Sequence, residues 1–551
     1  MSSSVRNSIK LTLMTMISRV LGLVRDHFLA RFFGTGMISS FWEIAYMFPN
    51  MLRNLLAEGV LSQSFIPLYS ESLKKSEIQA KKDTGKVIGF LSIFFMIFVS
   101  LMIFLFPLIL PWYVGKPKEE IQLLILLSQI LFGMIGFLSI LSIFSGILNT
   151  HNIFVIPALV PILLNLVFIF TFLGFVFFLY FYQIPTDTIA LGLAFTVLVG
   201  SGLICFFLYS YVKHKGWAPQ IQFFFLYWKD PTIKKLFKLV LPAVLGASIF
   251  QLNQLLDIFL ASYFIRIEGA IPALRFAHRL IQLPTGIIGV AISTTILPVL
   301  ASHIRKNVSP IESGKELIHG IRFSLFLTIP ATIGMYLLGP WIIHFLFSGG
   351  LWSFQSTIIT WWCLQFYIIG IPFYSMNKIL TASFYAYQDS KTPVKILFFT
   401  VSVNLVLNLL FIPVLEHGGL ALSTAVTSIL NFVLLFYFFK KKPIEIPYDE
   451  FIDFFKKSLF IFFMIFCYLL FLKYFFSFPL EKDLFFLNKN LFNLNLSSFE
   501  KSLPTRKDSF VVVFLGISGS ILIHFVLSKK LLKKEWTIIE DLVRSKIKKT
   551  F

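Results

Sequence analysis

The chain has 551 residues, of which 57% are hydrophobic and only 14% are charged, and its formal net charge is +21. Soluble domains carry roughly 45–50% apolar and about 25% charged residues, so the composition excludes an ordinary soluble protein and predicts one that crosses a membrane many times. The excess lysines cluster in short loops, where they set topology and contact anionic lipid, so we expect no nucleic-acid partner.

The apolar stretches predict an all-α polytopic membrane protein. A span needs about 20 apolar residues, and about fourteen stretches meet that length. In chain order they lie near 9–33, 39–69, 86–112, 120–149, 155–182, 187–212, 234–265, 270–302, 316–346, 354–388, 392–413, 418–440, 451–476 and 508–530.

Charge in the connecting loops predicts the orientation. Even-numbered spans are followed by segments rich in lysine and arginine, at 74–86, 213–235, 305–306, 440–442 and 529–534. Most odd-numbered spans are followed by short, glycine-rich turns, while 477–507 is longer and mixed in charge. The positive-inside rule then places both termini in the cytoplasm.

An internal repeat predicts two pseudo-symmetric lobes. Residues 26–33 match residues 257–264 at five of eight positions, and the same offset aligns Pro67 with Pro298. Six spans separate the copies, so the repeats are expected to be parallel. We therefore expect an N-lobe at 1–215, a C-lobe at 216–442, and two further helices with a basic tail at 443–551.

Arginines inside apolar stretches are the strongest functional signal. Arg19, Arg25, Arg53 and Arg279 each lie in such a stretch. A charge at membrane depth is costly, so it usually faces a protein interior or a wet cavity. The planar guanidinium fork suits phosphate, and these residues therefore predict a cavity for an anion. For Arg25, a structural network with Asp26 remains an alternative.

Polar neighbours accompany these arginines. Asn50 falls on a stripe with Arg53, Glu58 is a nearby acid, and Gln282 lies on the stripe of Arg275 and Arg279. Prolines and glycines lie beside these stripes, and they predict either static kinks or hinges: Pro49, Pro284, Gly286, Gly370 and Pro372.

A second polar group could bind a cation. Asp257 in the seventh span, Asn404 and Asn408 in the eleventh and Thr424 in the twelfth carry the hard oxygen ligands that Na⁺ or a proton requires. The alternative is hydrogen bonding between helices. The sequence contains no catalytic constellation and no metal motif, so we expect neither an enzyme nor a metal site.

Several motifs together resemble the MurJ (MviN) family of lipid II flippases. They are Ser18–Asp26, Phe48–Asn50 with Arg53, Ala57–Gly59, Ser62–Pro67, Arg279–Pro284, Gly286–Ala291, Phe384–Ala386 and Thr392-Pro393. The resemblance runs from about residue 8 to 440. It implies the fold of the multidrug/oligosaccharidyl-lipid/polysaccharide (MOP) exporter superfamily, with helices thirteen and fourteen forming a groove for a lipid tail.

The resemblance also implies a function and a site. It suggests transport of lipid II, the undecaprenyl-diphosphate-linked peptidoglycan precursor, across the bacterial inner membrane by a monomer in contact with membrane lipids. The family's essential arginines correspond to Arg19, Arg25, Arg53 and Arg279, and its sodium ligands to Asp257, Asn404, Asn408 and Thr424. Departures from the family pattern are Ser40, Gln282 and Asn408, which stand where some members have acids.

Other interpretations stay open at this point. A related MOP exporter, either a polysaccharide-lipid flippase or a MATE-like drug exporter, has the same architecture, although an arginine-rich cavity repels cationic drugs. A membrane-embedded glycosyltransferase is a third possibility. No resident cofactor is expected, and Na⁺, H⁺ and the membrane potential are alternative driving forces.

Overall fold

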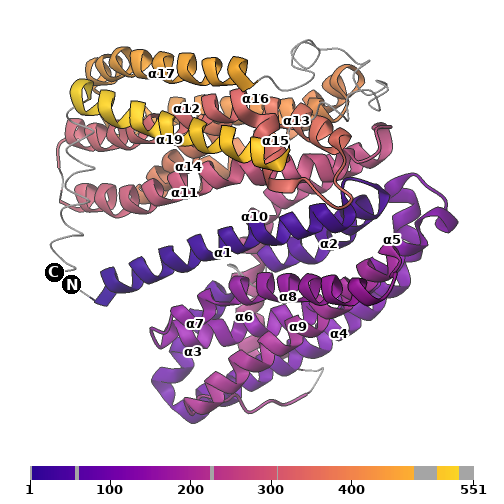
Figure 1. Cartoon of the computed structure of the whole chain (residues 1–551). Coiled ribbons are helices and arrows are strands. Elements are labelled where there is room, and N and C mark those ends of the chain that lie inside the picture. Colours follow the sequence, from indigo (N-terminus) through magenta and orange to yellow (C-terminus); the bar gives the residue numbers. More distant parts are fainter. Residues whose placement is uncertain are drawn as a thin grey trace. The chain divides into compact units, whose positions relative to one another are not determined.

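The computed structural model describes residues 3–55, 61–223, 227, 229–306, 308–476 and 505–532. Within these residues the secondary structure is helical apart from one isolated bridge between Gly349 and Trp352 (Figure 1). The chain divides into two compact units, Met1–Pro272 and Ala273–Phe551. Each unit is therefore described by itself, and the predicted division at residues 215 and 442 stays a prediction.

The first unit contains the helices of the first seven predicted spans (Figure 1). They are α1 (Ser3–Phe33), α2 (Met37–Leu55), α3 (Leu61–Lys75), α4 (Glu77–Val114), the 3-10 turn η2 (Lys118–Ile121), α5 (Gln122–Phe132), α6 (Met134–Thr150), α7 (Val155–Ala158), α8 (Val160–Phe181), α9 (Thr186–His214) and α10 (Pro231–Phe264). Helix α10 packs against α4 in this unit, where the Tyr113 hydroxyl donates to the carbonyl of Leu255 at 2.8 Å.

The second unit begins within the first turn of α11 and contains the remaining helices. They are α11 (Ala270–Arg305), α12 (Pro310–Phe347), α13 (Phe354–Ile369), α14 (Ile371–Ala386), α15 (Lys391–Leu415), α16 (His417–Phe439), α17 (Tyr448–Phe476) and α19 (Arg506–Leu531). Helices α12, α17 and α19 pack together, so the two C-terminal helices are part of this unit.

Helices occupy all fourteen predicted ranges, but not all of them meet the criteria for a span. Among the described residues, nine helices are long and apolar enough to cross a membrane, or ten if the pair α13 and α14 is one span bent by 46°. The all-α polytopic membrane architecture is thus confirmed, whereas the number fourteen stays a prediction. The bend falls at Gly370; α2 and α11 continue through Pro49 and Pro284.

The start of the third predicted span is built in the same way as the start of the ninth. Ser76 caps α4 by accepting from the backbone N–H of Gln79, and Ser309 caps α12 by accepting from Glu312. A serine hydroxyl satisfies a helix N–H that otherwise lacks a partner. Both helices therefore begin with the same capping arrangement.

A linker also lies directly on each of these two helices. The backbone of Gln220, after α9, covers Gly85 of α4, and the backbone of Glu445, after α16, covers Gly314 of α12. Gln220 N–H donates to the carbonyl of Lys81 at 3.1 Å, and Glu445 N–H donates to that of Pro310 at 3.2 Å. A Cβ at either glycine would overlap the linker carbonyl, so only glycine permits this approach.

This contact predicts a large difference between two Gly→Ala substitutions. Gly85→Ala forces the 220 linker off α4 and should lower the free energy of unfolding by about 1–3 kcal/mol. Gly136→Ala, in α6, is the matched control because nothing lies within 4 Å of its added Cβ; it should be neutral or stabilise by up to about 1 kcal/mol. Thermal unfolding in detergent measures both. Equal melting temperatures would contradict the contact.

A charged contact ties the loop after α14 to the end of α16. Asp389 accepts from Lys442 Nζ at 2.8 Å and from the Thr392 backbone N–H and hydroxyl at 3.0 and 2.8 Å. The bond from Lys442, followed by those from Thr392, lowers the pKa of Asp389 to about 2. The carboxylate therefore stays charged through the physiological range, and it anchors the start of α15.

The lowered pKa predicts how Asp389→Asn behaves with pH. A carboxylate whose folded pKa lies below its unfolded value of about 3.9 stabilises the fold above that value and loses this effect as pH falls toward 2. The melting temperature of Asp389→Asn should therefore lie below that of the parent by a constant amount from pH 8 to pH 5. The gap should shrink below about pH 4. A gap that already closes near pH 6 would mean that another group controls the contact.

Candidate functional site

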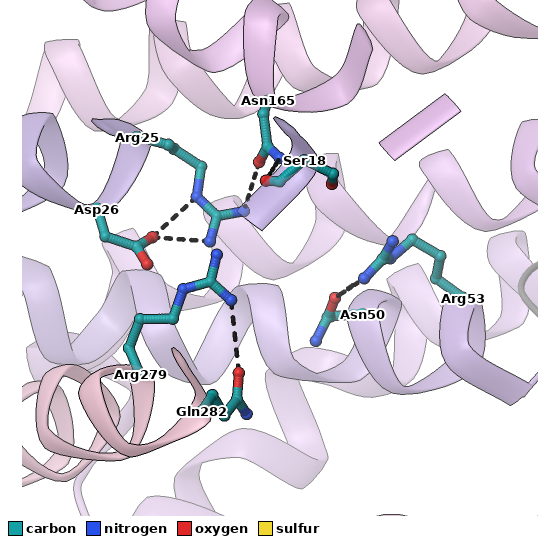
Figure 2. A network of polar contacts seen from close by, with 8 residues as sticks. All are labelled: Ser18, Arg25, Asp26, Asn50, Arg53, Asn165, Arg279 and Gln282. Atoms are coloured by element: carbon teal, nitrogen blue, oxygen red, sulfur yellow. Dashed lines mark hydrogen bonds and ion pairs between the residues drawn. The ribbon is translucent and has the colours of Figure 1, made fainter. Parts of the chain in front are cut away.

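Arg25 of α1 is the centre of a polar network in the first unit (Figure 2). Its Nε and Nη2 donate to Asp26 Oδ1 at 2.9 and 2.7 Å, and its Nη1 donates to Asn165 Oδ1 of α8 at 3.3 Å. Asn165 Nδ2 in turn donates to the carbonyl of Ser18 at 3.0 Å. The guanidinium also lies over the ring of Phe168. Arg25 thus takes part in the Arg–Asp network that the sequence left as an alternative.

The network is buried, which determines its electrostatics. Asp26 and Asn165 are 6% and 7% exposed. A buried guanidinium needs a compensating charge and hydrogen bonds, and Asp26 and Asn165 supply them. Arg19, on the same helix, is half-buried. Whether Arg19 and Arg25 contact a substrate stays a prediction.

Arg53, near the end of α2, borders a cavity of about 340 Å³ that lies wholly within the first unit. Its Nε and Nη2 donate to Asn50 Oδ1 at 3.2 and 2.9 Å, as the predicted stripe requires (Figure 2). We call this space the Arg53 cavity. It is lined by Leu11, Arg53, Ser62, Gln63, Leu138, Leu141, Ser145, Asn149, Phe154, Pro157, Ala158, Val160 and Pro161. Glu58 lies outside the described residues.

Arg279 lies in a second cationic group, on α11 of the second unit. Its Nη1 is 3.5 Å from Gln282 Oε1 (Figure 2). Gln282 Nε2 is 3.1 Å from His278 Nδ1. The charges of Arg275 and Lys378 also lie near His278. The predicted stripe on α11 is therefore present, and it can offer several donors to an anion.

Lys378 of α14 joins this group, although the sequence analysis did not single it out. Its Nζ donates to the carbonyl of Thr285 at 3.2 Å, and its stem passes over Gly289 of α11. The side chain is exposed in the structure, yet it belongs to a predicted span. An ionisable residue deep in an apolar stretch is itself a functional signal, and that rule would have found Lys378.

The predicted cation ligands are only partly brought together by the described contacts. Asn408 Nδ2 donates to Asn404 Oδ1 at 3.0 Å, and Asn404 Nδ2 donates to Thr427 Oγ1 of α16 at 3.3 Å. The hydroxyl of Thr424 donates to the carbonyl of Leu420 at 2.9 Å. These contacts are hydrogen bonds within and between helices, with Thr427 as the residue that the sequence analysis missed.

Asp257 belongs to the other unit, where it accepts from Asn253 Nδ2 at 3.3 Å. Its approach to Asn404, Asn408 and Thr424 therefore stays a prediction, and so does the binding of Na⁺ or a proton. The amide oxygens of the two asparagines have the right chemistry for such an ion.

The fold is one that solved structures of membrane transporters share. It is similar to an inward-facing multidrug resistance MATE transporter of the MOP superfamily, with a TM-score of 0.62 over 79% of this chain and 99% of that chain at 13% identity. A solved structure of lipid II flippase MurJ in an inward closed conformation aligns more fully. Its TM-score is 0.74 at 26% identity, over 95% of this chain and 100% of that chain.

Sequence comparison then identifies the family. The family model for lipid II flippase MurJ matches residues 29–489. The protein named probable lipid II flippase MurJ of Rickettsia prowazekii is 34% identical over 79% of this chain and 84% of its own length. Lipid II flippase MurJ of Burkholderia cenocepacia is 30% identical over 80% and 84%. The chain therefore belongs to the MurJ lipid II flippase family.

The network around Arg25 predicts a role for Asn165 that is separate from its effect on folding. Asn165→Ala leaves Nη1 of the partly buried Arg25 without its amide acceptor, and it should destabilise the fold by about 1–3 kcal/mol. Because the guanidinium can then reorient, complementation of a strain depleted of its own flippase should fall at least tenfold.

Gln129→Ala is the matched control, because Gln129 also makes a hydrogen bond between helices, to the carbonyl of Ile103. It should lower the melting temperature by a similar amount and leave complementation nearly intact. If the two variants complement equally well, Asn165 contributes only to packing, and function does not require Asn165 to orient the Arg25 guanidinium.

Proposed function

We propose that the protein moves lipid II from the cytoplasmic to the outer leaflet of the bacterial inner membrane, with both of its termini in the cytoplasm. The observation that carries the proposal is a guanidinium, that of Arg53, on the wall of a cavity inside a bundle that belongs to the lipid II flippase family. The names of the MurJ relatives indicate lipid II as the substrate. The guanidinium of Arg53 is the group that would bind the diphosphate of that lipid.

The cationic residues would neutralise the charged part of the substrate while it is away from water. A diphosphate carries a charge that is very costly to bury without partners. Guanidinium groups offer paired donors that match phosphate oxygens, and Arg53 and Arg279 each sit beside an amide that restricts their rotamers. In alternating access, binding and release would occur from opposite faces of the bundle as its halves rearrange.

The other interpretations fit these residues less well. A drug exporter takes mainly cations, which the group formed by Arg275, Arg279 and Lys378 would repel. The substrate of a polysaccharide-lipid flippase would also carry a diphosphate. Only the sugar part of the substrate distinguishes that function from the proposed one. A glycosyltransferase is disfavoured by membership in a transporter family.

The proposal includes several finer statements that await tests. We propose a monomer in contact with membrane lipids, without nucleic acid and without a resident cofactor. Either Na⁺ or H⁺ bound near Asp257, Asn404, Asn408 and Thr424, or the membrane potential acting on the cationic residues, would drive the cycle. Indifference of transport to Na⁺, together with a silent Asp257→Asn, would leave the membrane potential as the driving force.

Removal of single arginines tests the proposal. Arg53→Ala and Arg279→Ala should each abolish lipid II translocation, because each removes a charge that holds the diphosphate. Arg→Lys at the same positions should retain part of the activity, since the charge stays and the fork is lost. The measurements are growth after depletion of the host flippase and the fraction of lipid II reached by a probe from outside.

Arg305→Ala is the matched control on the same helix as Arg279. Arg305 is exposed at the end of α11, where its Nε donates to the carbonyl of Ala301. This variant should transport normally. Normal transport by Arg53→Ala and Arg279→Ala at wild-type expression would overturn the proposed role of these arginines.

A further inference from the structure

We propose that the Arg53 cavity is a binding site for an N-acylated amino sugar, and that the side-chain amides of Gln63 and Asn149 hold its acylamino group. The inference rests on the proposed function and names the part of the substrate that this cavity would recognise. It begins from a close crossing of two helices and ends with two side-chain amides that make no hydrogen bond among the described residues.

The crossing of α3 and α6 brings the two amides to one space. Gly146 of α6 lies against α3: a Cβ there would be 2.8 Å from Phe65 Cδ1 and 3.5 Å from the carbonyl oxygen of Ser62. Phe65 is 1% exposed, which fixes the crossing point. Gln63 follows Ser62 on α3, Asn149 lies about one turn beyond Gly146 on α6, and both line the Arg53 cavity.

The two amides have no partner within the described part of the chain. The hydroxyl of Ser145 donates to the carbonyl of Leu141, and Arg53 donates to Asn50, so these lining residues have partners in the protein. The structure gives no hydrogen bond to the side chains of Gln63 and Asn149. Asn149 is half-buried and Gln63 is exposed. Both therefore offer a carbonyl and an NH₂ group to whatever fills the cavity.

The donor and acceptor groups of two side-chain amides suit an acylamino substituent. In a trans secondary amide the N–H and the C=O point in opposite directions, so one side-chain amide cannot pair with both. Two separate amides can, one accepting from the N–H and the other donating to the C=O. A plain hydroxyl in the same place would use only part of this donor and acceptor set.

The remaining walls and the volume agree with a sugar. Phe154, Pro157 and Pro161 offer apolar surface against which the C–H face of a pyranose can pack. A volume of about 340 Å³ lies within the range of small-molecule sites. Arg53 on the same cavity can reach the phosphate on the anomeric carbon, so the cavity matches an N-acylated glycosyl phosphate from its charged end to its substituent.

The test compares three ligands on the full-length protein in nanodiscs. They are undecaprenyl diphosphate, the same lipid linked to N-acetylglucosamine, and the same lipid linked to 2-deoxyglucose, which has no polar group at C2. Two neutral hydrogen bonds are each worth about 1 kcal/mol, so the wild type should bind the N-acetylglucosamine lipid roughly 10- to 30-fold tighter than the 2-deoxyglucose lipid. Equal binding of the two sugar-linked lipids by the wild type would overturn the proposal. The cavity would then be a water-filled space that does not recognise the sugar.

Variants then assign the preference to the two amides. Gln63→Met and Asn149→Leu keep the side-chain size, and each should reduce the preference to about fivefold or less while binding of undecaprenyl diphosphate is unchanged. Gln122→Met is the matched control, because Gln122 is an exposed glutamine at the start of α5, outside the cavity. Preserved discrimination in both cavity variants would show that other groups read the sugar.

The same measurements separate this inference from the proposed function. Arg53→Ala should weaken binding of all three lipids together, since all carry the diphosphate. If the wild type translocates lipid II but shows no preference for the acylamino group, only the sugar site fails. If it binds none of the three lipids and does not translocate lipid II, the proposed function fails as well. Gln63 is exposed, so Gln63→Met tests the inference even if Asn149→Leu does not fold.

Discussion

The cost of placing a guanidinium among apolar side chains determines how the polar parts of this protein are arranged. Such a group needs hydrogen bonds or counter-charge nearby, and the chain provides them in different ways. Arg25 has a carboxylate and an amide, in a network that joins α1 to α8. Arg53 and Arg279 contact the amides of Asn50 and Gln282, which are neutral.

This difference separates two kinds of arginine. An arginine beside a carboxylate has part of its charge already compensated, so it adds less to the attraction of an anion. A contact with a neutral amide orients the guanidinium. We therefore regard Arg25 as a residue that organises the first unit, and the bonds to Asn50 and Gln282 as contacts that orient Arg53 and Arg279.

The periodicity of the sequence predicted side-chain contacts within a helix, but it missed contacts between helices. Apolar length gave the polytopic class, and helical spacing placed Asn50 beside Arg53 and Gln282 beside Arg279. It could not show that Arg25 donates a hydrogen bond to Asn165, which lies far along the chain. The packing of α1 on α8 cannot be predicted from the residue pattern of either helix alone. Thr427 was missed for the same reason: Thr424, on the same helix, was an equally plausible partner for Asn404 until the packing of α15 on α16 was known.

The linkers that lie on Gly85 and Gly314 have a consequence for how the chain can vary. Each linker makes its contact through backbone atoms, since a carbonyl covers the glycine and an N–H bonds to the helix below. The side chains of Gln220 and Glu445 are not needed for that contact, so other residues can replace them. Gly85 and Gly314 cannot be replaced without disturbing the contact. Substitutions on the two sides of the same contact are therefore tolerated very unequally, and an inserted or deleted linker residue would do more harm than almost any exchange of its side chains.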